Sequence, residues 1–175
     1  MNKASEVAEQ LDTVGVVALL PGELSHERVH MVADALLAAP ILAVEIIPNG
    51  PNALDTVEAF RKRAGDNMIV GAGRVESAAQ LTAAINAGAQ FASSMYDFHL
   101  PLMSAARKQN FLYIPTVHAP GQALVAYRGG SRWQKIRDDI DVEGMEGMQE
   151  RLSTCLLYTS PSPRDLSTSR MPSSA

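Results

Sequence analysis

The stretch that decides the fold is a short apolar run with one acidic residue inside it, Ile41-Leu42-Ala43-Val44-Glu45-Ile46-Ile47-Pro48. An apolar run of this length, ended by proline, predicts a strand of a parallel sheet that is buried on both faces. A carboxylate inside such a strand costs several kcal/mol in desolvation unless it is paired. Glu45 therefore belongs either to a buried structural pair or to a proton-transfer site, and its sequence context leaves both interpretations open.

Similar apolar runs alternate with amphipathic segments along the chain. We expect strands at residues 14–20, 41–47, 68–73, 90–95, 111–117 and 132–136. We expect helices after an N-cap at Ser25 and over about residues 52–63, 77–87, 100–109 and 120–127. Strands that alternate with helices of this length predict a parallel sheet with right-handed crossovers, either closed as a barrel or open and doubly wound.

The loops help to choose between these two architectures. Residues 71–76 contain the first two glycines of a dinucleotide-binding G-x-G-x-x-G motif but lack the third, which favours small residues that let a strand end approach its neighbours. In a βα barrel the chemistry lies at the carboxyl ends of the strands. The polar residues expected at those ends are Glu45, Asn49, Arg74, Ser93, Ser94, Tyr96, Thr116, His118 and Lys135. A buried carboxylate and an apolar-flanked lysine on two strands of one sheet suggest imine chemistry.

Composition narrows the class of protein. The chain has 175 residues, 46% hydrophobic residues and a net charge of -4, which indicates one globular domain without a basic surface for nucleic acid. Cys155 is the single cysteine, and no Cys/His cluster has metal-ligand spacing, so we expect neither a disulfide nor a metal or other cofactor. The N-terminus has no apolar signal region and no apolar stretch reaches membrane-spanning length, which predicts a cytoplasmic protein without a membrane partner.

Four segments carry a resemblance to a known family: Val44-Glu45-Ile46, Ile69-Val70-Gly71-Ala72-Gly73-Arg74-Val75, Ala87-Gly88-Ala89-Gln90-Phe91-Ala92-Ser93-Ser94 and Ile114-Pro115. Together they resemble the 2-keto-3-deoxy-6-phosphogluconate / 4-hydroxy-2-oxoglutarate aldolases, over about residues 10 to 138. The resemblance implies a (β/α)8 barrel, a usually trimeric assembly, and a class I carbon–carbon lyase that cleaves a 2-oxo acid to pyruvate or glyoxylate-type products. It also implies Glu45 as the acid/base and Lys135 as the Schiff-base lysine.

The chain departs from the family pattern around the expected pocket. Lys135 is followed by Ile136-Arg137-Asp138 instead of the usual x-F-P, and Asn49 stands where the family usually has an arginine for the anionic end of the substrate. Other departures are Arg74 for threonine, Met95 for the proline after A-x-S, and Thr116 for the glycine of I-P-G. We therefore hypothesise that Arg74 holds the substrate anion, with pairing of Arg74 to Glu76 on the surface as the alternative. Gly73, Asn49 and His118 complete the expected substrate-binding set.

The end of the chain has a different composition. From Ser153 the sequence is rich in Ser, Thr and Pro, which predicts disorder, and it also resembles a translated sequencing adapter. We expect a partial barrel domain of about six strands over residues 1–152 and a disordered or artefactual tail over residues 153–175. A chain truncated in this way is expected to be inactive and poorly folded, because open barrel edges leave backbone groups unpaired.

Two alternative functions remain open. One alternative function is a barrel of the phosphate-sugar isomerase or synthase type, which needs acid/base groups but no imine lysine. The other is a non-catalytic barrel used for binding or assembly. Among single residues, Trp133 is expected to face outward against a helix or a neighbouring subunit, and His26 and His30 are expected to be solvated residues instead of a metal pair.

Overall fold

The computed structural model describes residues 3–47, 53–95 and 98–136. Five parallel strands pair in chain order, namely β1 (Ala18–Pro21), β2 (Ala43–Ile47), β3 (Ile69–Ala72), β4 (Phe91–Ser93) and β5 (Leu112–Ile114). A second parallel pair follows, β6 (Thr116–Val117) with β7 (Lys135–Ile136). Pro115 separates β5 from β6, and its carbonyl accepts a hydrogen bond of 2.9 Å from the Lys135 backbone N–H. The strands therefore form one continuous wall in which β5 and β6 act as a single barrel strand.

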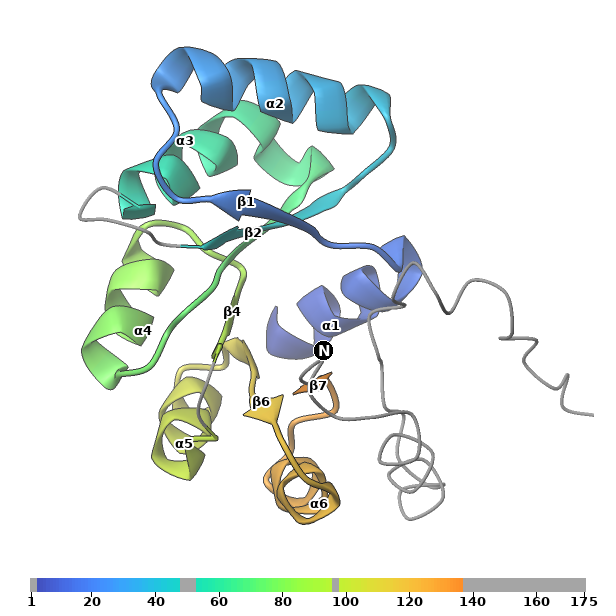
Figure 1. The fold of residues 1–175 in the computed structure, drawn as a ribbon, viewed down its shortest axis with the longest axis vertical. Helices are drawn as coiled ribbons and strands as arrows, with labels where there is room; N and C mark the ends of the chain where they lie inside the picture. Colours follow the sequence, from blue (N-terminus) through green and yellow to red (C-terminus); the bar gives the residue numbers. More distant parts are fainter. Residues whose placement is uncertain (1–2, 48–52, 96–97, 137–175) are drawn as a thin grey trace, which may run out of the picture.

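Helices cover the outer side of this wall. They are α2 (His26–Ala38), α3 (Ala53–Ala64), a 3-10 turn η1 (Gly65–Asn67), α4 (Ala78–Asn86), α5 (Leu100–Lys108) and α6 (Pro120–Arg128). Figure 1 shows the strands as an arc with α2 to α6 outside it, while α1 (Lys3–Val14) lies on the inner side. This arrangement confirms the predicted fold class, an α/β structure with an incomplete (β/α)8 barrel and six barrel strands in the described part of the chain.

The N-terminal helix corrects the prediction for the first strand. Val14 is the last residue of α1, whereas the sequence pattern placed it at the start of a strand over residues 14–20. Gly15 ends the helix with a φ of 70°, a conformation that glycine adopts without steric cost, and its N–H donates to the Leu11 carbonyl at 3.0 Å. The first strand therefore begins only at Ala18.

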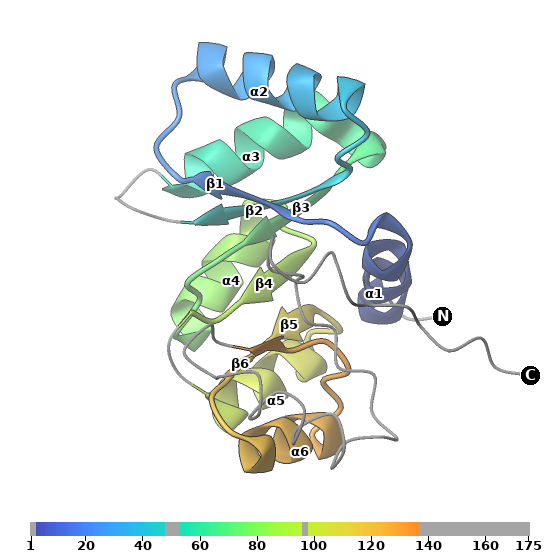
Figure 2. The same cartoon turned by 45° about the vertical axis from the view of Figure 1, so that its right-hand side comes forward.

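Alternation along the strands divides the apolar residues into two clusters. The outer cluster fills the space between strands and helices and includes Val44, Ile46, Val70, Ala92 and Phe60. The inner cluster lies inside the arc and consists of Val7, Leu11, Ala43, Ile69, Phe91 and Ile114. Because successive strand residues point to opposite faces, one sequence run supplies both layers. The two α1 residues in the inner cluster show that this helix covers the amino-terminal end of the barrel interior, as Figures 1 and 2 both indicate.

Trp133 was expected to face outward, and the structure corrects that expectation. Its ring packs against the inner cluster, beside residues of α1. Trp133 precedes Lys135 by two residues, so both side chains lie on the same face of the chain at β7. The tryptophan is thus part of the packing beneath the lysine.

The arc is open beside β1. Leu19 pairs in register with Glu45, yet 59% of its surface is exposed. Within the described residues β1 pairs with β2 on one side, and its other side carries no strand. The predicted domain boundary at residues 152/153 and the predicted tail lie outside the described residues. Among the described helices, none is both long and apolar enough to cross a bilayer.

Candidate active site

Three polar side chains meet inside the barrel, one each from β2, β4 and β7. Lys135 Nζ donates to Glu45 Oε1 at 2.6 Å and to Ser93 Oγ at 2.8 Å. Ser93 Oγ in turn donates to the same Glu45 Oε1 at 2.7 Å. The three groups therefore form a closed triangle of hydrogen bonds, which we call the Glu45–Ser93–Lys135 triangle.

The strand alternation that builds the core also places this triangle. Ala43 and Glu45, Phe91 and Ser93, and Trp133 and Lys135 are pairs two residues apart, and each pair points inward. In every pair the first residue is apolar and the second is polar. The interior thus changes from a packed apolar layer to a polar site within two residues of strand.

Gly73 leaves the room that the carboxylate occupies. A Cβ atom at Gly73 would lie 2.5 Å from Glu45 Oε1, closer than real carbon atoms approach. The backbone of Gly73 is itself held by a hydrogen bond of 2.8 Å from its N–H to the Ile46 carbonyl. The glycine named from the sequence as a site residue therefore lies directly beside the predicted acid/base.

Burial in the triangle is unequal. The side chain of Glu45 is 3% exposed and that of Lys135 is 35% exposed, while Ser93 is fully buried. A buried carboxylate requires hydrogen bonds and a counter-charge, and Lys135 and Ser93 supply both. Of the three side chains, only that of Lys135 has substantial solvent exposure. A ligand from solvent therefore reaches the amine before the carboxylate.

Ser93 was among the polar strand-end residues read from the sequence, but it was not assigned to the site. The signal that could have found it is its spacing from Phe91. A large apolar residue at the start of β4 faces the interior, so the residue two positions later faces the interior as well.

Arg74 follows β3 at the same end of the sheet. Its φ is 51°, a left-handed conformation that costs a non-glycine residue about 1–3 kcal/mol and is concentrated at functional sites. Its Nε donates to the Met95 sulfur at 3.0 Å, and Glu76, the alternative partner considered from the sequence, accepts the Met95 N–H at 2.9 Å. His99 Nε2 lies 3.7 Å from the other oxygen of Glu76. Arg74 is therefore anchored to the end of β4 through methionine.

The two remaining substrate-binding candidates have different outcomes. Asn49 lies outside the described residues, as does Tyr96. His118 directly follows β6 and is half-buried, and its backbone N–H donates to Gln122 Oε1 at 2.7 Å at the start of α6. Sequence and structure thus agree on the position of His118 at the carboxyl end of the barrel wall.

Ser94, the residue after β4, and its neighbours make structural contacts. Ser94 Oγ accepts the Thr116 N–H at 2.6 Å, and Thr116 Oγ1 donates to the Ser94 carbonyl at 2.8 Å. Tyr113 donates its hydroxyl to the Val75 carbonyl at 3.0 Å. Burial raises the pKa of Tyr113 to about 12, a hydrogen bond with Ser94 opposes this shift, and the nearby charge of Glu76 adds to it. These contacts join the segments that follow β3 and β4 to the next barrel strand, formed by β5 and β6.

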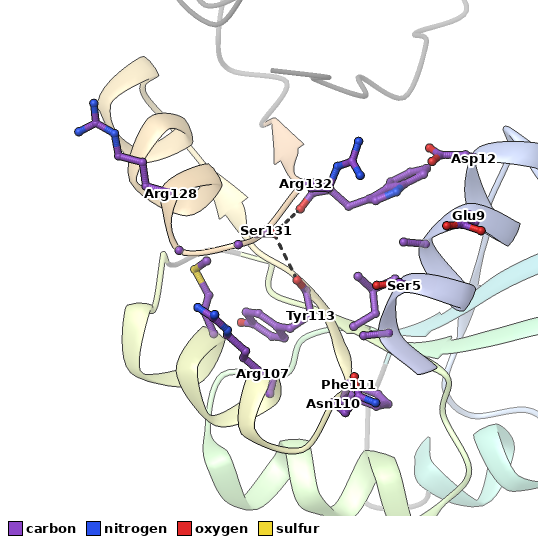
Figure 3. Close-up of a pocket in the computed structure, with 18 residues that line it drawn as sticks. Ser5, Glu9, Asp12, Arg107, Asn110, Phe111, Tyr113, Arg128, Ser131 and Arg132 are labelled. Carbon is purple, nitrogen blue, oxygen red and sulfur yellow. Dashed lines mark hydrogen bonds between the residues drawn. The ribbon is translucent and has the colours of Figure 1, made fainter. Parts of the chain in front are cut away.

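A cavity lies at the amino-terminal end of the strands, away from the triangle. It has a volume of about 580 Å³ and is lined by α1, the ends of α5 and α6, and the residues that enter β5 and β7. In Figure 3, Ser5, Glu9 and Asp12 of α1 line one side, and Ser131 lies across from them, donating to the Trp133 carbonyl at 2.6 Å. Because parallel strands enter at this end, the cavity is at the amino-terminal mouth of the barrel, away from the expected chemistry.

His26 and His30 lie four residues apart on α2. Both are exposed on α2, opposite Asp55 and Glu58 of α3. Over residues 3–47, 53–95 and 98–136, no group of three or more His, Cys, Asp or Glu side chains is arranged to hold a metal ion.

The fold and the triangle together are those of a βα-barrel protein that carries a buried carboxylate beside a lysine amine. A model of the KDPG and KHG aldolase family matches residues 7–150 of the sequence. The chain belongs to this family of carbon–carbon lyases, which confirms the resemblance noted from the motifs.

Solved structures of low sequence identity share the fold. The 2-keto-3-deoxy-6-phosphogluconate aldolase of Zymomonas mobilis ZM4, solved with 3-phosphoglycerate, is 21% identical with a TM-score of 0.73, over 84% of this chain and 72% of that chain. The KDPG aldolase of Legionella pneumophila, solved with pyruvate captured as a covalent carbinolamine, is 21% identical with a TM-score of 0.72, over 81% and 68%. A thiamine phosphate pyrophosphorylase from Pyrococcus furiosus is 10% identical with a TM-score of 0.56, over 82% and 72%. The comparison with curated proteins gave no match.

Proposed function

We propose that Lys135 and Glu45 are the catalytic pair of a class I aldolase that cleaves a 2-oxo acid. The observation that carries the proposal is the contact of 2.6 Å between Lys135 Nζ and Glu45 Oε1, in which the lysine is partly exposed and the glutamate is buried. A structural ion pair has no need of an amine that is 35% exposed in front of a carboxylate that is 3% exposed. A Schiff-base site needs this order, since the substrate carbonyl has to reach the amine while the acid/base stays beside it.

The proposed reaction begins with the neutral Lys135 amine attacking the C2 carbonyl to form a carbinolamine. Glu45 donates the proton with which the hydroxyl leaves as water, and a protonated imine remains. The imine withdraws electrons from the C3–C4 bond, so cleavage leaves an enamine on the lysine instead of a free carbanion. Glu45, again a carboxylate, accepts the proton of the C4 hydroxyl as the aldehyde product departs. Protonation of the enamine and hydrolysis then release the 2-oxo acid product.

We further propose that the substrate is of the 2-keto-3-deoxy-6-phosphogluconate or 4-hydroxy-2-oxoglutarate type, with products of the pyruvate or glyoxylate type. Arg74 is the proposed anion ligand because a guanidinium binds a carboxylate with two parallel hydrogen bonds. Its left-handed backbone, anchored through Met95, supports this role. Gly73, Asn49 and His118 complete the proposed substrate-binding set.

Two alternative functions account less well for the contact between Lys135 and Glu45. The structural likeness to a thiamine phosphate pyrophosphorylase illustrates that this barrel also hosts other chemistry. An isomerase or synthase site, however, does not require a lysine amine in contact with the carboxylate. A non-catalytic barrel would need neither group buried in a polar triangle, since an apolar pair of the same size packs at least as well.

We also propose that the protein is a cytoplasmic homo-oligomer, trimeric as the family resemblance implies, that acts in carbohydrate metabolism. A designed protein cage made by fusing symmetric oligomeric domains is among the similar structures, at 23% identity and a TM-score of 0.71. Analytical ultracentrifugation of the purified protein measures the oligomeric state directly.

The function is tested by incubating the protein with pyruvate and sodium borohydride, which reduces an imine to a stable secondary amine. Two forms are assayed in parallel: the 175-residue chain, and a barrel-completed form. In the barrel-completed form, this chain is kept up to Ile136. The two structures are superposed, and Ile136 is joined to the segment of the Zymomonas mobilis aldolase that follows the residue matched to Ile136. In the barrel-completed form we expect a mass increase corresponding to one reduced pyruvate, and none in its Lys135→Ala variant. Lys108→Ala, which removes an exposed lysine of α5, is the matched control and should be labelled normally. Normal labelling of Lys135→Ala would contradict the assignment.

A further inference from the structure

We infer that Ser93 is a third catalytic residue of this site, a hydroxyl that relays a proton between Lys135 and Glu45 and fixes the carboxylate for the reaction. The inference rests on the proposed aldolase function, since it concerns the same two groups. In the A-x-S signature of the family resemblance, Ser93 occupies the variable position, so the family pattern does not assign it a role.

The geometry of Ser93 fits a relay. Its Oγ accepts a hydrogen bond from Lys135 Nζ at 2.8 Å and donates one to Glu45 Oε1 at 2.7 Å. A hydroxyl that accepts from the acid and donates to the base can pass a proton in one concerted movement. Ser93 is fully buried, so no solvent competes for either of these hydrogen bonds.

The relay serves the first step of imine formation. One proton moves from the Lys135 ammonium to Ser93 Oγ, while the serine proton moves to Glu45 Oε1. The serine is unchanged, and the products are a neutral amine and a neutral carboxylic acid. The amine then forms the N–C2 bond, the carbonyl π electrons move to oxygen, and one amine proton transfers to that oxygen. The proton held by Glu45 leaves with this hydroxyl as water, so the final state is a protonated imine and a carboxylate.

Ser93 also determines which carboxylate oxygen faces the substrate. Among the described residues, Lys135 and Ser93 both donate their hydrogen bonds to Oε1 of Glu45. The Gly73 backbone, just after β3, lies against the same oxygen, because no side chain separates them. With Oε1 held in this way, the carboxyl group cannot rotate freely, and the oxygen that receives the relayed proton stays beside the Lys135 amine, where the substrate hydroxyl forms. Fixing a catalytic group in its reactive orientation is a large source of rate acceleration.

β4 offers a matched control in the next residue. Ser94 is also fully buried and also uses its hydroxyl, but it accepts the Thr116 backbone N–H and has no part in the triangle. Ser93→Ala and Ser94→Ala therefore each remove one buried hydroxyl, at the last residue of β4 and at the residue after it, with comparable losses of thermal stability. A structural role for Ser93 predicts similar behaviour of the two variants in every assay.

The experiment measures the rate of borohydride-trapped imine formation with pyruvate, in the 175-residue chain and in the barrel-completed form. We expect Ser93→Ala to slow labelling roughly 10- to 100-fold with a smaller change in the pyruvate concentration for half-saturation, because the acid/base step is impaired while binding is not. Ser94→Ala should label at the rate of the unsubstituted protein. In mixtures of H2O and D2O, a two-proton relay predicts a curved dependence of the rate on deuterium fraction, which becomes linear in Ser93→Ala.

The outcomes separate this inference from the function on which it rests. If the unsubstituted protein forms no trapped imine in either form, the proposed aldolase function fails. Two outcomes leave the aldolase assignment standing and refute the relay. In the first, the unsubstituted protein and Ser93→Ala are labelled equally fast. In the second, the unsubstituted protein is labelled and Ser93→Ala and Ser94→Ala are slowed equally. Restoration of the rate by Ser93→Thr, which keeps a hydroxyl, supports the relay.

Discussion

The two ends of the barrel interior have opposite compositions although the same strands build both. At the amino-terminal end, Val7 and Leu11 of α1 pack against the apolar residues of β2 to β5 in the inner cluster. At the other end, Glu45, Ser93 and Lys135 form a polar triangle. The change occurs within two residues of each strand, which is the smallest step that keeps a side chain on the same face.

This difference assigns the stability of the fold to the amino-terminal layer and the proposed imine chemistry to the polar layer. The amino-terminal layer supplies buried apolar area, and its residues have no group that transfers a proton. The polar layer loses stability through desolvation, and it regains part of that loss from hydrogen bonds within the triangle. Substitutions at the two ends should therefore affect different measurements, and the following predictions test that separation.

Leu11→Ala should produce the largest effect on stability. Leu11 is 1% exposed at the centre of the α1 contact, and the removal of a buried leucine side chain costs about 2–5 kcal/mol. Equilibrium urea unfolding measures the loss, with Gln10→Ala, on the exposed face of α1, as the control that should be nearly neutral. The imine-labelling rate below the melting temperature should stay close to that of the unsubstituted protein. A proportionate fall in labelling would show that the two ends are not separable.

Gly73→Ala and Gly71→Ala compare the polar layer and the apolar layer directly, because Gly71 lies in β3 and Gly73 follows it by two residues. A Cβ at Gly73 would meet Glu45 Oε1 at 2.5 Å, whereas a Cβ at Gly71 would meet the Phe91 ring at 2.2 Å. Gly73→Ala should displace the carboxylate and slow imine labelling on the order of 100-fold, as a misplacement of about 1 Å does. Gly71→Ala should overpack the interior and lower the free energy of unfolding by about 1–3 kcal/mol. If the two variants showed the same profile, the proposed boundary between the layers would be wrong.

Tyr113 provides the smallest and most pH-specific effect. Its pKa is raised from 10.0 to about 12 in the folded protein, so the neutral phenol is favoured by folding. That contribution is complete below pH 10 and is lost as the pH rises through about 12, because the unfolded chain releases the proton first. We expect a loss on the order of 2 kcal/mol across this window. Tyr113→Phe should be less stable by about 1 kcal/mol at neutral pH, for the lost hydrogen bond, and should show a shallower alkaline decline. Parallel declines in the two proteins would contradict this.

Much of the fold and part of the site could be predicted from the sequence. The apolar run around Glu45 and the glycines after residue 70 are local signals, and they predicted the barrel, the buried carboxylate at position 45 and a close approach of neighbouring strands at the glycines. The helix over residues 3–14 was missed because its apolar face consists of few residues, with Val7 and Leu11 the buried ones, and because its end at Val14 continues into the apolar residues 16–20. A tertiary contact with the inner cluster, not local propensity, fixes this helix.

Ser93 and Trp133 have one feature in common. The sequence pattern alone does not group Ser93 with Glu45 and Lys135, and it predicts Trp133 on the outer face, yet each lies two residues from a residue that faces the interior. Strict use of the two-residue period would have placed Trp133 on the face of Lys135 and Ser93 on the face of Phe91. The position of Arg74 against Met95 is different, since it depends on contact between two loops that no local pattern reports.

The central claim is that Lys135 forms the imine, and one measurement tests it most directly. The protein is trapped with pyruvate and borohydride, digested, and mapped by tandem mass spectrometry. We predict a single modified residue, Lys135, in the peptide that contains Trp133 and Gln134. A label on any other lysine, or saturating pyruvate with no label in a cooperatively melting protein, would contradict it.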